Sequence, residues 1–236
     1  MTSNSPPLPN RLLASLARED LQALRPHLKP VQLAQGLVVF DPGQEVRQVY
    51  FPHSGVISLV VGLSDGVFIE AAMVGRDGAV GASAALNGKT SLYKAIVQLP
   101  GTASVVDAAR VEAIADKNKA FRTQLIRHEQ IILAQAQQSA ACNAKHSVEA
   151  RLCRWLLHLR DLSGADQFPI THEFLAQMLG VRRTSVTLVV KPLQNKGLIV
   201  PRRGQMHVAD VEGLRKSACE CYGRVKHYYD RLLGSE

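Results

Sequence analysis

The uneven distribution of glycine along this chain constrains its fold more than any other feature. Between about Leu33 and Val106, short apolar or alternating runs such as LVVF, GVISLVVGL and AIVQL are separated by turns that contain glycine. Several short strands punctuated in this way are typical of a β-sandwich or β-barrel. From Asp107 to Gly164 glycine is absent and apolar residues recur at intervals of three, four or seven, which predicts helices. We therefore expect an α+β protein, with a short leucine-rich helical segment before the strands and longer helices after them.

A long helix is predicted over residues 119–146. Its apolar residues form one narrow stripe, and the C-terminal part of that stripe is made of small residues. Small residues let a second helix approach closely, so the stripe predicts a seam between two copies of the chain. A helix that packs on its own β-domain explains the same pattern, and the pattern alone leaves both interpretations open. The seam residues of the first interpretation are Leu125, Ile132, Ala136, Ser139 and Asn143.

The last third of the chain has the pattern of a helix, a turn, a second helix and a hairpin. Thr171 is a suitable N-cap for the first helix, and Gly180 ends that helix. A helix-turn-helix needs a small residue where the helices cross, a glycine-like residue in the turn and an aliphatic anchor in the second helix. Ala176, Gly180 and Val186 occupy these places. Pro192 lies inside the second helix and predicts a kink or an early end there. Asp210 is expected to cap one final helix that runs to the C-terminal leucines.

Positive charge is concentrated in the same region. The chain has a net charge of +8, and the window between Phe174 and Ala209 holds six Lys or Arg residues and no Asp or Glu. A solvated protein surface normally mixes both signs, so an acid-free basic window favours a polyanion such as DNA over a helical hairpin with incidental charges. The side chains predicted to contact DNA are Arg182, Arg183, Thr184, Ser185, Thr187, Leu188, Lys191, Arg202 and Arg203. Arg183 suits guanine, Leu188 suits a thymine methyl group, and Lys191 and the two hairpin arginines suit phosphates.

Over nearly its whole length the chain resembles Crp/Fnr-type transcription regulators. LVVFDPGQEVRQVYFPHSGVISLVV is similar to the family's β-roll, and THEFLAQMLGVRRTSVTLVVKPLQNKGLIV is similar to its winged helix. The resemblance implies a β-roll sensor domain over residues 1–118, a dimerisation helix over 119–146 and a winged-helix DNA-binding domain over 147–236. It also implies a homodimer on a two-fold DNA site, with double-stranded DNA as partner, RNA polymerase as a further candidate partner and control by an effector.

The chain departs from the cyclic-nucleotide members of this family. Where they hold the phosphate with a Gly-Glu step and an Arg-Ser pair, this sequence reads AVGASAAL and SLYKAIV. A phosphate needs a neutralising cation and a ribose needs a hydrogen-bond acceptor, so we do not expect a cyclic nucleotide. Two interpretations remain for this stretch, a cradle for another anion or a plain structural turn. The residues of the candidate effector pocket are Gly81, Ala82, Ser83 and Lys94.

No other cofactor is predicted. The oxygen-sensing members ligate a cluster with cysteines near the N-terminus, and here no cysteine precedes Cys142, so we do not expect an iron–sulfur cluster. Haem remains conceivable only because His27 and His53 exist. The recognition helix also departs from the family, since Thr184 and Leu188 stand where glutamate and arginine are frequent, so the DNA sequence cannot be transferred from relatives.

The sequence argues against one alternative function and leaves a second one open. A cupin-like metalloenzyme needs two histidines one residue apart, which the sequence lacks, so we expect no enzyme activity and no metal. The four cysteines show no CxxC pair, so the sequence indicates neither a disulfide framework nor a structural zinc site. A redox-responsive regulator acting through Cys219 and Cys221, or through Cys142, stays open because basic residues lie nearby. No apolar run has the length of a signal peptide or a membrane span, which predicts a cytoplasmic protein without membrane contact.

Overall fold

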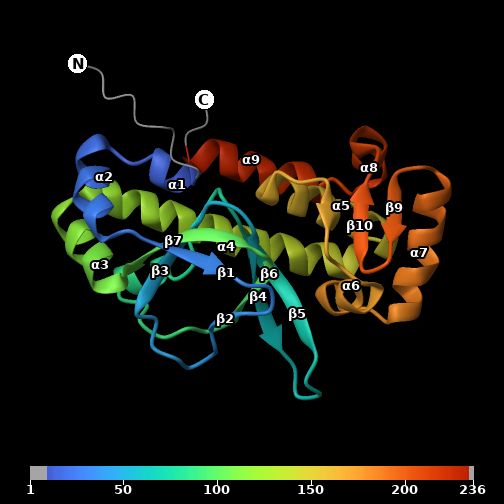
Figure 1. Cartoon of the computed structure of the whole chain (residues 1–236), viewed down its shortest axis with the longest axis horizontal. Helices are drawn as coiled ribbons and strands as arrows, with labels where there is room; N and C mark the ends of the chain where they lie inside the picture. Colours follow the sequence, from blue (N-terminus) through green and yellow to red (C-terminus); the bar gives the residue numbers. More distant parts are fainter. Residues whose placement is uncertain (1–9, 234–236) are drawn as a thin grey trace.

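The computed structural model describes residues 10–233 (Figure 1). The leucine-rich segment at the start forms two short helices and one 3₁₀ turn. These are α1 (Arg11–Ala14), α2 (Arg18–Leu24) and η1 (Arg25–His27). Asn10 caps α1 by accepting a hydrogen bond from the Leu13 N–H, and its buried amide nitrogen donates to the carbonyls of Pro52 and Gly78. The N-terminal helices are thereby fixed to the strands that follow.

A β-roll made of two antiparallel sheets follows. Its strands are β1 (Lys29–Leu33), β2 (Val38–Phe40), β3 (Gln48–Pro52), β4 (Val56–Gly62), β5 (Phe68–Val74), β6 (Lys94–Leu99) and β7 (Gly101–Asp107). One sheet has the order β1-β7-β3 and the other the order β2-β6-β4-β5. A 3₁₀ turn, η2 (Ala82–Leu86), lies between β5 and β6. The predicted β-rich first half is confirmed.

The long helix closes the open side of the roll. Helix α3 (Ala108–Lys117) leads into α4 (Lys119–Lys145), whose N-cap Asn118 accepts hydrogen bonds from two backbone N–H groups. Phe121 and Leu125 of α4 are almost fully buried and belong to the same apolar core as Phe51 and Ile57 of the strands. The core of the roll therefore includes one face of α4, which runs from α3 at the left of Figure 1 toward the second unit at the right.

The second unit begins with α5 (Val148–Ser163). Ser147 caps this helix, and Gly164 ends it in a left-handed conformation. Its remaining elements are β8 (Gln167–Phe168), α6 (His172–Leu179), α7 (Arg183–Asn195), β9 (Ile199–Arg202), β10 (Gln205–Val208), α8 (Val211–Ser217) and α9 (Cys221–Leu233). The three strands form a small sheet in the order β8-β10-β9. Its core is continuous with Val56, Val60 and Met73 of the roll, so the two units share an apolar interface.

Two expectations for this unit are wrong. The single final helix is divided, because Ala218 takes an extended conformation after α8 and the chain restarts as α9 at Cys221. The early end that was one of two outcomes expected at Pro192 is also wrong, because α7 continues to Asn195, whereas a kink at Pro192 stays a prediction. The Asp210 cap itself is confirmed, since its carboxylate accepts from the Gly213 N–H.

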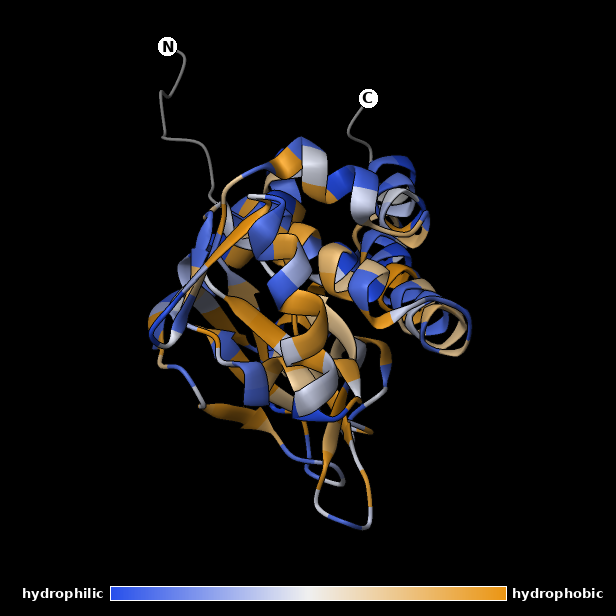
Figure 2. Cartoon of the chain, turned by 90° about the vertical axis from the view of Figure 1, so that its right-hand side faces the viewer, coloured by the Kyte–Doolittle hydropathy of each residue, from blue (hydrophilic) through white to orange (hydrophobic). Residues whose placement is uncertain are grey.

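In Figure 2, hydrophobic residues are frequent in the strands of the roll, whereas the helices carry both hydrophobic and hydrophilic residues along their length.

Among residues 10–233, no helix combines the length and the apolar character that crossing a bilayer requires.

Candidate nucleic-acid interface

The turn between α6 and α7 has the local geometry that the sequence predicts. Thr171 caps α6 by accepting a hydrogen bond from the Phe174 N–H at 3.2 Å. Gly180 has φ +61°, a left-handed conformation that costs glycine little. Ala176 is 4% exposed and Val186 is fully buried, so the crossing residue and the anchor both point inward. The predicted helix-turn-helix frame is confirmed.

The opposite face of α7 is largely exposed to solvent. Arg182, Arg183, Thr184, Leu188 and Lys191 are exposed. Leu188 is 74% exposed, which is unusual for a leucine among polar neighbours and suits a site that meets a methyl group. The nearest carboxylate is that of Glu173, whose Oε2 lies 3.9 Å from Arg183 Nε, too far for a hydrogen bond.

Two of the predicted DNA-contacting residues, Ser185 and Thr187, are partly buried or form contacts within the chain. Ser185 is partly buried. The Thr187 hydroxyl donates to the Arg183 carbonyl at 3.2 Å and lies 3.2 Å from His172 Nδ1, although the side chain is exposed. His172 therefore borders the outward face of α7, a neighbour that the sequence pattern did not indicate.

The hairpin β9–β10 carries the remaining basic residues beside α7. Arg202 ends β9, Arg203 and Gly204 form the turn, and both arginines are exposed. Gly204 has φ +70°, which allows the tight reversal. The outward face of α7 and this hairpin tip form the basic surface, defined here as Arg182, Arg183, Thr184, Thr187, Leu188, Lys191, Arg202 and Arg203.

The β-roll holds this unit by contacts from β5 and its neighbours. The Trp155 indole N–H of α5 donates to Glu70 Oε1 at 2.8 Å, and the Ser58 hydroxyl donates to Glu70 Oε2 at 2.6 Å. Burial raises the pKa of Glu70 to about 7, although these hydrogen bonds and the Arg154 charge lower it. The side chain of Ile69 would lie only 3.1 Å from a Cβ at Gly180. Strand β5 thus contacts the helix-turn-helix directly.

A cleft separates the β4–β5 hairpin from the start of α7. Its volume is about 550 Å³, and its apolar wall comes from the hairpin residues Leu63, Val67 and Ile69. The opposite wall includes Arg182 and Arg183. In this arrangement the hairpin lies beside the first turn of α7, so the position of the roll affects access to that turn.

The candidate effector residues lie around η2 and β6. Gly81 has φ +90° and caps η2, with the Gln48 carbonyl so close that a Cβ would collide with it. Ala82 is fully buried. Lys94 Nζ lies 3.0 Å from Asp41 Oδ1 and 4.8 Å from the centre of the Phe68 ring. Lys94 is therefore already paired, and the turn at Gly81 is explained by packing alone, while the anion-cradle hypothesis stays a prediction.

The predicted seam residues of α4 do not share one exposed face. Leu125 is 1% exposed and Ser139 is 8% exposed within a single chain, so their side chains contact their own chain. Ile132 and Ala136 are partly buried, and Asn143 is exposed. The large apolar side chains of α4 that are exposed are those of Ile126 at 42% and Leu133 at 58%, one heptad apart.

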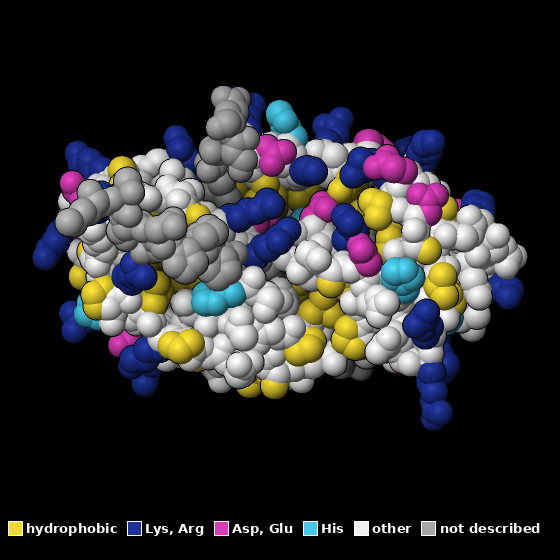
Figure 3. Space-filling view, turned by 45° about the horizontal axis from the view of Figure 1, so that its top comes forward, with side chains coloured by type: hydrophobic (Ala, Val, Ile, Leu, Met, Phe, Trp, Pro, Cys, Tyr) yellow, Lys and Arg dark blue, Asp and Glu magenta, His cyan; other side chains and the backbone are white. Residues whose placement is uncertain are grey.

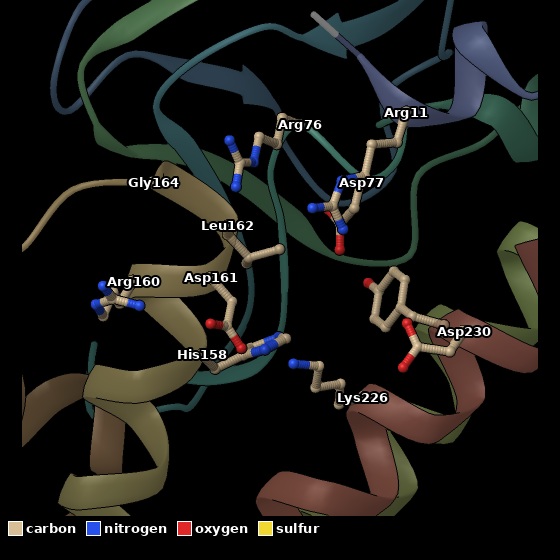
Figure 4. Close-up of a pocket in the computed structure, with 11 residues that line it drawn as sticks. Arg11, Arg76, Asp77, His158, Arg160, Asp161, Leu162, Gly164, Lys226 and Asp230 are labelled. Atoms are coloured by element: carbon tan, nitrogen blue, oxygen red, sulfur yellow. The ribbon is translucent and has the colours of Figure 1, made fainter. Parts of the chain in front are cut away.

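A polar cavity of about 330 Å³ lies where the turn after β5 meets α1, α5 and α9. Lys and Arg side chains border a hollow on the face seen in Figure 3. Asp77 lies between Arg11 and Arg76 in Figure 4, and burial raises its pKa to about 6. Four basic side chains line the cavity together with three carboxylates, so its charges nearly balance and it gives no preference for an anion. They are Arg11, Arg76, Arg160, Lys226, Asp77, Asp161 and Asp230.

The structure also brings together three of the four cysteines. Cys142, near the end of α4, lies 3.5 Å from Cys219 between their sulfur atoms, and Cys221 lies 3.5 Å from His146 Nδ1. From the sequence, the cysteines indicate neither a disulfide framework nor a structural zinc site and leave only redox chemistry open, and this interpretation does not include His146. The spacing of Cys142 and His146 by one helical turn, and the Cys-x-Cys step, were the available signals.

Family models match both halves of the chain. A model described as a cyclic nucleotide-binding domain matches residues 30–118, and one described as a Crp-like helix-turn-helix domain matches residues 150–217. No curated protein matches the chain.

Solved structures of similar fold exist for full-length regulators. FixK2 from Bradyrhizobium japonicum has a TM-score of 0.70 at 15% identity, covering 81% of this chain and 98% of its own. A Crp/Fnr-family regulator from Eubacterium rectale gives 0.68 at 16%, covering 87% and 96%. The regulator CLP of Xanthomonas campestris, described as responsive to c-di-GMP, gives 0.66 at 17%, covering 82% and 100%. At these identities the likeness establishes the fold.

Proposed function

Because the chain belongs to the Crp/Fnr family of transcription regulators, we propose that it binds a two-fold DNA site as a homodimer and acts as a regulator rather than an enzyme. The basic surface is the observation that carries this proposal. It presents seven exposed polar and basic side chains around one apolar leucine, five of them on α7 or at its N-cap and two on the hairpin, and the other face of α7 is buried. Such a helix fits the width of the major groove of B-DNA.

Base reading and phosphate binding are assigned to different parts of the basic surface. Arg183, in the first turn of α7, is placed to donate two hydrogen bonds to a guanine, and Leu188, one turn further on, to contact a thymine methyl. Lys191 and the hairpin residues Arg202 and Arg203 flank the helix and would bind phosphates without reading sequence.

The dimer is assigned to the exposed apolar face of α4. Ile126, Leu133 and Ala140 repeat at heptad spacing, and all three are exposed in the single chain. Of the residues predicted from the sequence stripe, Ala136 and Asn143 lie beside this face, whereas Leu125 and Ser139 serve the chain's own packing. Two copies joined along α4 would present two α7 helices related by a two-fold axis, which matches a palindromic site.

The effector differs from a cyclic mononucleotide in this proposal. The place of the phosphate-binding glutamate holds the buried methyl group of Ala82, and Lys94 already pairs with Asp41. A cyclic nucleotide would therefore lack the ribose acceptor and would have to displace an existing ion pair.

The test is selection of bound fragments from random DNA by the purified full-length protein at physiological salt. Parallel samples contain no additive, cyclic AMP, or cyclic di-GMP, the last because one structural relative is described as responding to it. A palindromic motif recovered without additive supports the proposal. A motif recovered only with cyclic AMP would show that the assignment of Ala82 and Lys94 is wrong, and no enrichment under any condition would count against DNA binding.

Variants separate the two kinds of contact. Arg183→Ala should weaken binding to the selected motif by about 1–3 kcal/mol and leave non-specific binding nearly unchanged. Arg202→Ala should weaken binding to all DNA and lower the salt slope by about 1. Arg47→Ala is the matched control, because Arg47 is an exposed arginine on the roll that pairs with Glu45. Equal effects of Arg183→Ala and Arg202→Ala on specific and non-specific DNA would refute the division.

A further inference from the structure

Four potential metal ligands converge where α4 ends and α9 begins. They are Cys142, His146, Cys219 and Cys221, and their ligand atoms all lie within 4.8 Å of one another. Cys142 and Cys221 are almost fully buried, Cys219 is 8% exposed, and His146 is partly buried. We propose that these four side chains form a tetrahedral site for one Zn²⁺ ion per chain. The site lies outside the basic surface and does not depend on DNA binding.

Two of the distances between ligand atoms are close to those of a zinc site with three sulfur ligands and one nitrogen. With Zn–S near 2.3 Å and Zn–N near 2.0 Å, a regular tetrahedron places two sulfurs about 3.8 Å apart and a sulfur about 3.5 Å from the nitrogen. The two sulfur atoms of Cys142 and Cys219 are 3.5 Å apart, and Cys221 Sγ is 3.5 Å from His146 Nδ1. These two distances need changes of no more than about 0.3 Å, and the other pairs, all within 4.8 Å of one another, need shifts of about 1 Å or less to reach tetrahedral spacing.

Backbone features hold the ligands in place. Cys142 lies in the last turn of α4 and His146 is its C-cap, with the His146 N–H donating to the Cys142 carbonyl at 3.0 Å. Cys219 and Cys221 flank Glu220 in the break between α8 and α9. The break that divides the final helix is thus the feature that turns both cysteines toward the end of α4.

Neighbouring groups supply the outer contacts that zinc sites generally have. Glu220 Oε1 lies 3.2 Å from His146 Nε2, so the carboxylate can accept the Nε2 proton and leave Nδ1 free to bind metal. The Gln138 amide donates to Cys221 Sγ at 2.9 Å, a contact that stabilises a thiolate. Both contacts orient the ligands in the way expected for a metal-bound state.

The charge around the cluster also fits. Three thiolates and one Zn²⁺ carry a net charge of −1. Arg151 and Arg154 of α5 are 6% and 7% exposed, and in both the buried Nε has no hydrogen-bond partner among the described residues. The charge of Arg154 acts on Cys142, and Arg151 interacts with Cys142 and Cys219. Arg154 also acts on Glu70, whereas Arg151 donates to the Leu179 carbonyl and forms no ion pair with a carboxylate of the described residues. Burial of such a cation is costly, and an anionic zinc centre would offset this cost.

A disulfide is the competing interpretation. A Cys142–Cys219 disulfide would use two of the four groups. It would not explain why Cys221 and His146 lie within 4.8 Å of the same two sulfur atoms. The convergence of all four groups favours the metal. Zinc at this place would connect the start of α9 to the junction between α4 and α5, because the ligand His146 directly precedes Ser147, the N-cap of α5.

The first measurement is the metal content of the full-length protein, purified without chelator and dialysed. We expect one zinc per chain, released in step with modification of three thiols by a mercurial reagent. Cys142→Ser and Cys219→Ser should lose the zinc. Cys153→Ala is the matched control, because Cys153 is a buried thiol of α5 outside the cluster, and this variant should keep the zinc.

A second measurement covers the case in which the cysteine variants do not fold. The wild-type protein is stripped of metal and titrated with Co²⁺, which should give thiolate-to-cobalt charge-transfer absorption and the intense visible bands of a tetrahedral site. Absence of both zinc and the cobalt spectrum would overturn the proposal. So would a Cys142–Cys219 disulfide in the protein as purified, iron with acid-labile sulfide in place of zinc, or loss of zinc from Cys153→Ala.

Discussion

The Glu70 carboxylate joins the two units of the protein through a contact whose strength should depend on pH. Glu70 of β5 accepts hydrogen bonds from Trp155 of α5 and from Ser58 of β4, and burial raises its pKa from 4.5 to about 7. The unfolded chain loses this proton as the pH rises through 4.5, whereas the folded chain keeps it until about pH 7. The folded state therefore binds more protons in this interval, and its stability falls as the pH rises.

The size of the effect follows from the shift. Each unit of pKa difference corresponds to about 1.4 kcal/mol, and the shift would amount to a little over 3 kcal/mol for a group fully withdrawn from solvent. The Glu70 side chain is only partly buried, so we expect about 2–3 kcal/mol. Glu70→Gln removes the titration but keeps an oxygen for the Trp155 N–H and an amide that can donate to the Ser58 hydroxyl. The variant should be more stable than the wild type above about pH 8 and lose this advantage below about pH 5.

Trp155 is the only tryptophan in the chain, so its fluorescence reports on the contact itself. Urea unfolding would be followed by this signal across the pH range for the wild type and for Glu70→Gln. Glu45→Gln, which removes an exposed carboxylate of the roll, is the control and should follow the wild-type pH dependence. A difference between wild type and Glu70→Gln that stays constant with pH, or that favours the wild type as the pH rises, would refute the reasoning.

Substitutions at three further positions test the frame around the basic surface and the dimer seam. Gly180→Ala should lower the free energy of unfolding, measured with urea, by about 1–2 kcal/mol, because a Cβ is strained at φ +61° and meets Ile69. An unchanged unfolding midpoint would argue against the left-handed turn. Thr171→Ala should lower the free energy of unfolding by about 1 kcal/mol through loss of the α6 cap, whereas Thr171→Ser keeps a capping hydroxyl and should retain most of the wild-type stability. Leu133→Glu should convert the dimer to monomer in sedimentation without lowering the unfolding midpoint of the chain, and a variant that stays dimeric would exclude this face of α4 as the seam.

Features set by neighbouring residues could be predicted from the sequence. The Thr171 cap, the left-handed Gly180 and the buried Val186 depend on local backbone geometry and on helical spacing, and all three are present in the structure. The acid-free window likewise follows from residues that are close in sequence. These signals sufficed for the two-part fold and for the face of α7 that points outward.

Features set by distant segments could not be predicted. Cys142 and Cys219 are 77 residues apart in sequence, and only the break after Ala218 brings their sulfurs together. The periodicity of α4 revealed an apolar stripe but not which partner would cover it. Leu125 and Ser139 turned out to serve the chain's own packing, because the roll and α9 both pack on that face.

The contacts of β5 limit how a signal in the roll can reach the basic surface. Along this one strand Ile69 touches the turn at Gly180, Glu70 binds Trp155 of α5, and both backbone groups of Met73 bond to Gln135 of α4. The strand therefore contacts the long helix, the helix after it and the turn before α7. Close-packed contacts of this kind move together rather than one by one. An effector that displaces β5 would act on α7 without touching DNA. An effector that leaves β5 in place would have to act through α4 or through β4, whose Val56 and Val60 share a core with α5.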